Sequence, residues 1–210
     1  MGVILKKYVD DDCLLGIWEI TENYETLFSK VNLIAEEKII LDNFHNYQRK
    51  LEWLSVRILV NELLEKECRI VYNESHKPFL ADNSHLISIS HSKNLTSILV
   101  SSKKRVGIDL EFMSHQIHNI ANKFINDKEI ITNSPDQERL HLYVHWCAKE
   151  ALYKICDKQD INFKKNLTIQ PFELQAEDKI KGIVHNRFGE EHFSLGYFTI
   201  DGYVIVWCSK

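Results

Sequence analysis

The sequence has little of what marks a secreted, membrane-spanning or disordered protein. It holds three prolines and seven glycines in 210 residues, which leaves no Pro-rich or Gly-rich linker. Its longest stretch without Asp, Glu, Lys or Arg, residues 112–122, is far shorter than the run of about 18 apolar residues that spans a bilayer. Two lysines and three aspartates near the N-terminus interrupt the apolar core that a signal peptide needs. We therefore expect a protein without membrane contact.

The cysteines fit neither a disulfide framework nor a zinc cage. There are five, an odd number, and they are widely spread with no C-x-x-C pair. They are typical of reduced thiols, so the sequence predicts a cytoplasmic protein.

Charge excludes a further class. Lys and Arg number 26 against 30 Asp and Glu, a net charge of −4, whereas nucleic-acid scaffolds usually carry a basic excess that neutralises phosphates. With 44% hydrophobic residues, the chain is long enough for one large domain or two small ones. These values favour an enzyme or a binding module that does not bind nucleic acid.

Residues 47–66 carry leucine and isoleucine at helical spacing. Arg49, Trp53 and Arg57 recur along a second line of the same segment. The pattern predicts a helix with one buried face and a basic edge.

Three segments after this helix alternate like strands: residues 86–90, 95–101 and 106–112. We expect them to be adjacent in one sheet, with a hairpin at residues 103–105 joining the last two.

The second half repeats the order of helix and then strands. Residues 138–156 form the predicted helix, after a Ser-Pro-Asp stop at 134–136. Asp201-Gly202 predicts a tight hairpin turn between the last two strands. The expected strands are residues 167–174, 180–184, 192–200 and 203–208. The fold class predicted is α+β.

Two carboxylates share a strand in the segment VGIDLE, residues 106–111. Strand alternation points Asp109 and Glu111 to the same face, about 7 Å apart. A hard divalent cation such as Mg²⁺ would relieve their repulsion, since it takes oxygen ligands. Two solvated acids on an exposed strand edge would give the same pattern.

The predicted second helix holds Glu150 and Lys154 four residues apart, so both project from one side. The pair stabilises a helix by a few tenths of a kcal/mol on its own. Alternatively, Glu150 is a third metal ligand and Lys154 binds a phosphate.

Two further features gain meaning only in combination. His91 stands at the end of a predicted strand, where functional side chains often lie, although a surface role is the commoner one. Lys77-Pro78 forms a rigid turn beside a cation.

Four short motifs stand in order between residues 77 and 154: Lys77-Pro78, SISHS at 88–92, GIDLE at 107–111 and WCAKEALYK at 146–154. Together they resemble the signature of the Sfp-type 4′-phosphopantetheinyl transferases. Residues 49–64 and the strand-rich tail are compatible with this family. One departure is His76, which stands where the family usually has Gly before the Lys-Pro pair.

The resemblance implies a fold of two similar α+β halves related by a pseudo-two-fold, here residues 1–103 and 104–210. The C-terminal half would carry most metal ligands, and coenzyme A would bind in the cleft between the halves. The implied reaction moves the 4′-phosphopantetheine arm of coenzyme A to a serine of an apo acyl or peptidyl carrier protein and releases adenosine 3′,5′-bisphosphate.

The resemblance also implies roles for single residues. Asp109, Glu111 and Glu150 would hold Mg²⁺ against the pyrophosphate. Glu150 or a metal-bound water would accept the serine proton. The residues implied at coenzyme A are Lys154 and His91 at the phosphates, Lys77 and Pro78 at the adenine, Arg49 at the 3′-phosphate and Ser90 beside the nucleotide. Arg57 is the alternative to Arg49, and Glu129 resembles a family position near the site.

Two other functions remain open. His141 and His145 are four residues apart on the predicted second helix, which would suit a metal-dependent hydrolase, although the Glu that zinc peptidases have after the first His is absent. The second alternative is a binding module that has kept the fold without catalysis. The three carboxylates disfavour it, because their mutual repulsion would serve no purpose in a binding module.

The resemblance leaves the identity of the carrier open between fatty-acid, polyketide and peptide pathways. Carriers are acidic and this chain is slightly acidic as well, so we expect docking through a local patch. A monomer is expected, because two similar halves would complete the cleft within one chain.

Overall fold

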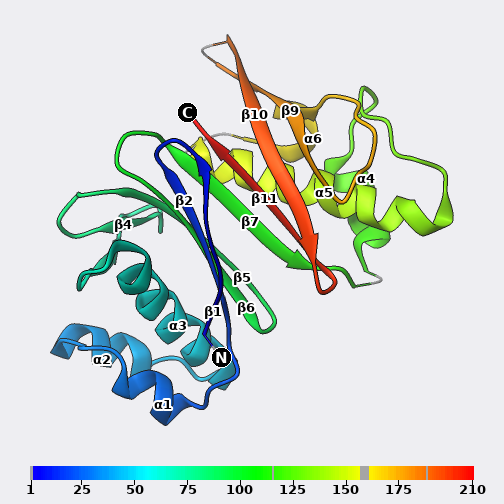
Figure 1. The fold of residues 1–210 in the computed structure, drawn as a ribbon. Coiled ribbons are helices and arrows are strands. Elements are labelled where there is room, and N and C mark those ends of the chain that lie inside the picture. The colour runs from blue at the N-terminus through cyan, green and yellow to red at the C-terminus, as the bar shows by residue number, and fades with distance from the viewer. Residues whose placement is uncertain (1, 115, 157–160, 188) are drawn as a thin grey trace. The chain divides into compact units, whose positions relative to one another are not determined.

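A computed structural model describes residues 2–114, 116–156, 161–187 and 189–210 (Figure 1). The chain divides into two compact units, Met1–Lys103 and Lys104–Lys210. Each unit packs a long helix against an antiparallel sheet and has its own hydrophobic core. The predicted mixture of helix and sheet is confirmed.

The N-terminal unit is built on a four-stranded sheet with the order β1-β2-β6-β5. Its strands are β1 (Val3–Asp10), β2 (Cys13–Glu19), β5 (Leu86–Ser92) and β6 (Leu95–Ser101). A small hairpin pairs β3 (Ile70–Tyr72) with β4 (Pro78–Leu80). The helices are α1 (Tyr24–Ser29), α2 (Ala35–Asp42) and α3 (Tyr47–Leu64).

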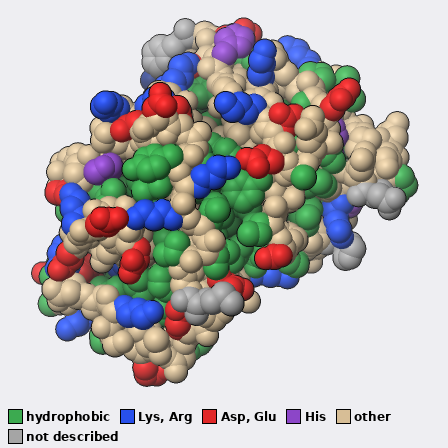
Figure 2. Space-filling view, viewed as in Figure 1, with side chains coloured by type: hydrophobic (Ala, Val, Ile, Leu, Met, Phe, Trp, Pro, Cys, Tyr) green, Lys and Arg blue, Asp and Glu red, His purple; other side chains and the backbone are tan. Residues whose placement is uncertain are grey.

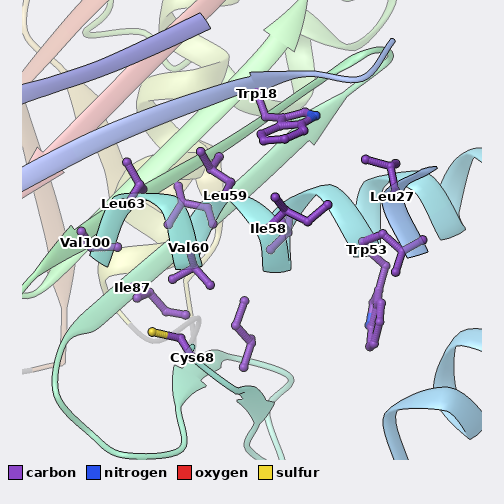
Figure 3. Packing of buried hydrophobic residues seen from close by; sticks show 14 of the residues in the cluster. Trp18, Leu27, Trp53, Ile58, Leu59, Val60, Leu63, Cys68, Ile87 and Val100 are labelled. Carbon is purple, nitrogen blue, oxygen red and sulfur yellow. The ribbon is translucent and has the colours of Figure 1, made fainter. Parts of the chain in front are cut away.

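Helix α3 lies against β2 and β6 and forms the centre of this core, where its Leu59 and Val60 are fully buried near Trp18 (Figure 3). The helix predicted over residues 47–66 is confirmed. It begins at the Asn46 cap, whose side chain accepts from the backbone N–H of Arg49.

The expectation of one buried face with a basic edge on α3 is wrong. Every residue from 51 to 60 is buried, because α3 has the sheet on one side and α1 on another. Arg57 is only 4% exposed; its guanidinium stacks on Trp53 and pairs with Glu37 of α2 at 3.5 Å. A basic side chain on a predicted edge is therefore part of the core.

The C-terminal unit has a five-stranded sheet with the order β7-β11-β10-β9-β8. The strands are β7 (Val106–Phe112), β8 (Leu167–Ile169), β9 (Glu177–Asn186), β10 (Gly189–Ile200) and β11 (Tyr203–Ser209). The helices are the 3₁₀ helix η1 (Ile117–Ile120), α4 (Ala121–Phe124), α5 (Pro135–Ile155) and α6 (Phe163–Asn166). Helix α5 confirms the helix predicted over residues 138–156.

Helix α5 packs on β7 and β11, and Gly107 allows the closest approach (Figure 1). A Cβ atom at Gly107 would lie 2.2 Å from the carbonyl oxygen of Ala151, so any side chain there would push the helix away. The glycine of the GIDLE motif thus sets the distance between the strand that carries Asp109 and the helix that carries Glu150.

Several local predictions are wrong. Strand β7 is not beside β6, because β2 and β5 occupy both edges of β6, and β7 pairs with β11 instead. Residues 103–105 therefore form no hairpin within one sheet. The N-terminal unit begins with two strands and not with a helix, and the strand predicted over 167–174 is reduced to β8.

The hairpin turn at Asp201-Gly202 is confirmed between β10 and β11. Both residues have positive φ, 47° and 81°.

The surface mixes both signs of charge, and Figure 2 shows blue and red side chains interspersed over the viewed face. All five cysteines are free thiols. In the part of the chain that the structure describes, no helix has both the length and the apolar character needed to cross a membrane.

Candidate active site

The two carboxylates of β7 lie on the side of the strand that meets α5. Asp109 is 3% exposed and Glu111 is half-buried. Burial raises the pKa of the Cys147 thiol on α5 well above its ordinary value, and the negative charges of Asp109 and Glu111 act in the same direction. Both carboxylates are thus electrostatically coupled to the same buried thiol.

Lys154, near the end of α5, is bound to this strand. Its Nζ donates to Asp109 Oδ1 at 2.7 Å and to the carbonyl oxygen of Ile108 at 2.9 Å. The lysine side chain is 19% exposed and the aspartate side chain 5%. Glu150, one turn earlier on α5, is half-buried. The structure therefore brings Asp109 and Lys154 into contact and carries Glu150 on the same helix.

The donor set suits a hard cation but is not assembled as a metal cluster. Carboxylate oxygens are ligands that Mg²⁺ takes in proteins, and the side chains of Asp109, Glu111 and Glu150 are all carboxylates. Among the residues described, no three His, Cys, Asp or Glu side chains group closely enough to hold a metal ion. One oxygen of Asp109 holds the Lys154 ammonium. The chemistry of the residues fits Mg²⁺, and the metal role stays a prediction.

A pocket of about 580 Å³ opens beside Glu150. Trp146 stands in its wall, with its ring 5.2 Å from the ring of Phe124 and 5.5 Å from that of Phe163. The lining is mainly apolar and consists of Ile120, Lys123, Phe124, Trp146, Glu150, Tyr153, Ile161, Asn162 and Phe163. The carboxylate of α5 thus borders a space shaped for an apolar or amphipathic group.

In the N-terminal unit, two of the predicted coenzyme A residues contact each other. Arg49 on α3 hydrogen-bonds to His91 Nε2, and Glu52 Oε2 lies 3.3 Å from Arg49 and 3.2 Å from His91 Nδ1. Because the Arg49 and His91 side chains are 41% and 35% exposed, both are accessible to an anion.

Arg57, the alternative to Arg49, is occupied elsewhere. Besides Glu37, its guanidinium donates to the carbonyl oxygens of Trp53 and Ile70. The buried arginine serves the core, so the structure favours Arg49 over Arg57 as a ligand contact.

The other residues predicted at coenzyme A lie on separate elements. Pro78 opens β4, and the backbone N–H of Lys77 donates to Asn73 Oδ1 at 2.9 Å. His76 has φ 58°, the left-handed conformation that favours glycine, so the turn keeps a glycine-like backbone without the glycine. Ser90 is buried on β5, where its carbonyl oxygen accepts from Ser97 Oγ.

The histidines of the alternative hydrolase site are buried on α5. His141 is 4% exposed and His145 is fully buried; both rings pack on Phe172. His141 Nδ1 accepts from the N–H of Thr132, and His145 Nδ1 donates to the carbonyl oxygen of His141. Burial lowers the pKa of His145 to about 3. This packing gives the hydrolase alternative no support.

Sequence reasoning missed two features around α5. Lys149 is completely buried beside Glu129, and Cys147 is buried against the β7 carboxylates. The position of Lys149 is a signal that could have been read, because it lies on the helical line of the buried residues His145 and Leu152.

Comparisons with known proteins agree with the motifs. Residues 105–208 match the sequence model of the 4′-phosphopantetheinyl transferase superfamily. The 4′-phosphopantetheinyl transferase AcpT of Salmonella typhimurium is 24% identical over 140 residues, which cover 62% of this chain and 73% of that protein. The 4′-phosphopantetheinyl transferase HetI of Nostoc is 29% identical over 92 residues, covering 40% and 39%. AcpT of Escherichia coli is 29% identical over 112 residues, covering 50% and 57%.

The matched segment spans nearly the whole C-terminal unit, with Asp109, Glu111, Glu150 and Lys154 inside it. That unit is therefore a domain of the transferase class. Residues 105–208 thus form a domain of the 4′-phosphopantetheinyl transferase superfamily, which confirms for this part of the chain the family that the four motifs predict. The family model and these relatives also confirm the expectation of a transferase enzyme.

Proposed function

We propose that the chain transfers the 4′-phosphopantetheine arm of coenzyme A to a serine of an apo acyl or peptidyl carrier protein. The observation that supports this best is the group formed by Asp109 and Lys154, with Glu150 on the same helix, inside the segment that matches the superfamily. Carboxylates and a lysine on neighbouring elements, with Glu150 lining a pocket, suit phosphoryl transfer, because its catalysis consists mainly of positioning and charge stabilisation.

In the proposed reaction, the serine oxygen attacks the phosphorus that carries the pantetheine. A new P–O bond forms to serine, and the bond from that phosphorus to the bridging oxygen breaks. Adenosine 3′,5′-bisphosphate leaves with the bridging oxygen, and the serine proton passes to a base. Glu150 is the proposed proton acceptor, since it is a half-buried carboxylate at the pocket wall.

Charge develops on the bridging and equatorial oxygens as the bond breaks. Lys154 is suited to stabilise it, because its ammonium is held by Asp109 and the Ile108 carbonyl before substrate arrives. Asp109, Glu111 and Glu150 would hold Mg²⁺ through their oxygens. When bound there, the ion would supply Lewis-acid stabilisation of the pyrophosphate.

The pocket beside Glu150 suits the transferred arm. The pantetheine chain is amphipathic, and the walls combine aromatic rings with Lys123 and Asn162. An arm seated there would have its phosphate end near Glu150. In the N-terminal unit, Arg49 and His91 are the proposed phosphate contacts, with Lys77 and Pro78 at the adenine and Ser90 beside the nucleotide.

A second pocket offers a local basic surface for the carrier. It measures about 310 Å³ and is lined by Asn126, Asp127, Lys128, Lys164, Lys165, Thr168 and His185. Residue Lys164 of this pocket directly follows Phe163 of the first one. An acidic carrier docked at these lysines would lie next to the pocket that Glu150 borders. The double variant K164E/K165E should then raise the carrier KM while leaving the coenzyme A KM unchanged; an unchanged carrier KM would exclude this docking surface.

The proposed function is tested by incubating the purified protein with coenzyme A, Mg²⁺ and a panel of apo carrier proteins. Intact mass should show the addition of one phosphopantetheine to at least one carrier. A known transferase run in parallel establishes that the carriers are competent. No mass shift on any carrier that this control modifies would contradict the proposal. Tightly bound zinc in the purified protein would favour the hydrolase alternative instead.

A further inference from the structure

The most deeply buried charges of the described chain belong to Lys149 on α5 and Glu129, in the segment that follows α4. Both side chains are 0% exposed, and Lys149 Nζ lies 2.8 Å from Glu129 Oε2. Bringing two charges out of water costs several kcal/mol, and an apolar pair of similar volume often gives equal or higher stability. Stability alone is therefore a weak reason for this pair.

The contacts of Lys149 point to another role. Its ammonium also donates to the carbonyl oxygens of Phe124, at the end of α4, and of Phe163, at the start of α6. Both phenylalanines line the pocket beside Glu150. One side chain thus ties two separate walls of the pocket to α5, at the residue directly before Glu150.

Glu129 keeps the ammonium in place and binds the surrounding backbone. Its Oε2 accepts from the N–H of Asn126, and its Oε1 accepts from the N–H of Ile169 on β8, each at 2.8 Å. The carboxylate is therefore held by two backbone donors as well as by Lys149. A charge with so many partners cannot move without disturbing the pocket walls.

We propose that Lys149, with Glu129 as its counter-charge, is a positioning residue that fixes both walls of the pocket relative to Glu150. This inference rests on the proposed function for its substrate, the pantetheine arm. The walls formed by Phe124 and Phe163 belong to short helices, and the buried ammonium joins them to the long helix that carries the carboxylate.

The test uses the double variant K149M/E129Q, which removes both charges at nearly constant volume and so leaves no buried unpaired charge. Binding of coenzyme A is compared with binding of adenosine 3′,5′-bisphosphate, which lacks the arm. The wild type should bind coenzyme A more tightly than the bisphosphate. In the variant, the affinity for coenzyme A should fall about tenfold, or about 1.4 kcal/mol, and the affinity for the bisphosphate should stay unchanged.

The matched control is R57M/E37Q, which removes the buried ion pair of the N-terminal unit (5% and 10% exposed). It should lower the melting temperature without changing the ratio of the two affinities. The positioning role is wrong if the wild type discriminates the two ligands and K149M/E129Q leaves the ratio of affinities unchanged. It is also wrong if R57M/E37Q lowers that ratio equally.

Hydrogen exchange separates this inference from the proposed function, because it needs no ligand. In K149M/E129Q, amides of residues 121–126 and 161–166 should exchange at least about tenfold faster, while amides of β10 and β11 stay protected. Unchanged exchange in both segments would overturn the inference whatever the ligands do. A wild type that binds both ligands equally would instead contradict the pocket assignment of the proposed function.

Discussion

The charged side chains of the candidate site are more buried in the C-terminal unit than in the N-terminal unit. In the C-terminal unit, Lys149 and Glu129 are 0% exposed, and Lys154 and Asp109 are 19% and 5% exposed. In the N-terminal unit, Arg49 and His91 remain 41% and 35% exposed around Glu52. Groups that stabilise developing charge work best when fixed in advance, whereas groups that bind a ligand phosphate can be ordered when it arrives. The comparison predicts chemistry in the C-terminal unit and binding in the N-terminal unit.

The largest effect should come from the carboxylates of the C-terminal unit. D109A or E150A should lower turnover at least about a hundredfold, or about 2.7 kcal/mol, because under the proposed function each removes a group that acts where charge develops. E111A should have a comparable effect if Glu111 is a ligand. The measurement is the rate of carrier modification by intact mass, with melting temperatures close to wild type.

The control for these variants is E138A, which removes an exposed carboxylate from the same helix. It should keep the wild-type rate. Near-normal rates in well-folded D109A and E150A would show that the site assignment is wrong, the more so if H141A and H145A lost activity.

The buried histidine of the C-terminal unit should make stability fall in acid. Burial lowers the pKa of His145 from 6.5 to about 3, so the unfolded chain binds this proton more readily than the folded one. The contribution of neutral His145 to the free energy of unfolding is therefore fully present above pH 6.5 and is lost as the pH falls toward 3. Between pH 7 and pH 5 the loss should be about 2 kcal/mol, measured by urea unfolding.

H145L is the matched variant for that experiment, because it fills similar space without a titrating group. Its stability should change less than that of wild type over the same pH interval. An equal decline in H145L would assign the acid sensitivity to other groups. Burial also lowers the pKa of His141, so the stability of H145L should still decline in acid, but less steeply than that of wild type.

The N-terminal unit should respond as a binding surface. R49A should raise the KM for coenzyme A about tenfold, or about 1.4 kcal/mol, with kcat nearly unchanged, because the proposed contact of the guanidinium is a phosphate remote from the reacting bond. K66A, which breaks the exposed pair with Asp82, is the control and should leave both constants unchanged. A fall in kcat with constant KM in R49A would erase the distinction between the units.

The smallest effect is expected at His76. H76G should raise the free energy of unfolding by about 1 kcal/mol or less, because the left-handed backbone at φ 58° strains a side-chain-bearing residue and not a glycine. Thermal unfolding measures it. A clear destabilisation would mean that the imidazole makes contacts that outweigh the strain.

Local patterns predicted the long elements well. Helix α5 shows apolar spacing over five turns, and the Asp201-Gly202 turn has a specific backbone requirement, so both were accessible from the sequence. The motifs placed Asp109 and Glu150 on a strand and a helix, and Gly107 explains why these approach each other.

Long-range pairing was not accessible in the same way. The partner of β7 is β11, at the far end of the chain, and no local pattern encodes it. The burial of Arg57 depends on Glu37 from a different helix, and that of Lys149 on Glu129 from a preceding loop. The helical position of Lys149 hints at its burial, but a charged residue is usually expected at the surface, and no local pattern identifies the partner that makes burial possible.

The most direct test of the transferase account measures carrier mass and released nucleotide in the same reaction. With coenzyme A, Mg²⁺ and an apo carrier, each phosphopantetheine added to a carrier should be matched by one adenosine 3′,5′-bisphosphate released, and D109A should suppress both together. Nucleotide release without carrier modification would identify a hydrolase, and the absence of both, with carriers that a known transferase modifies, would contradict catalysis altogether.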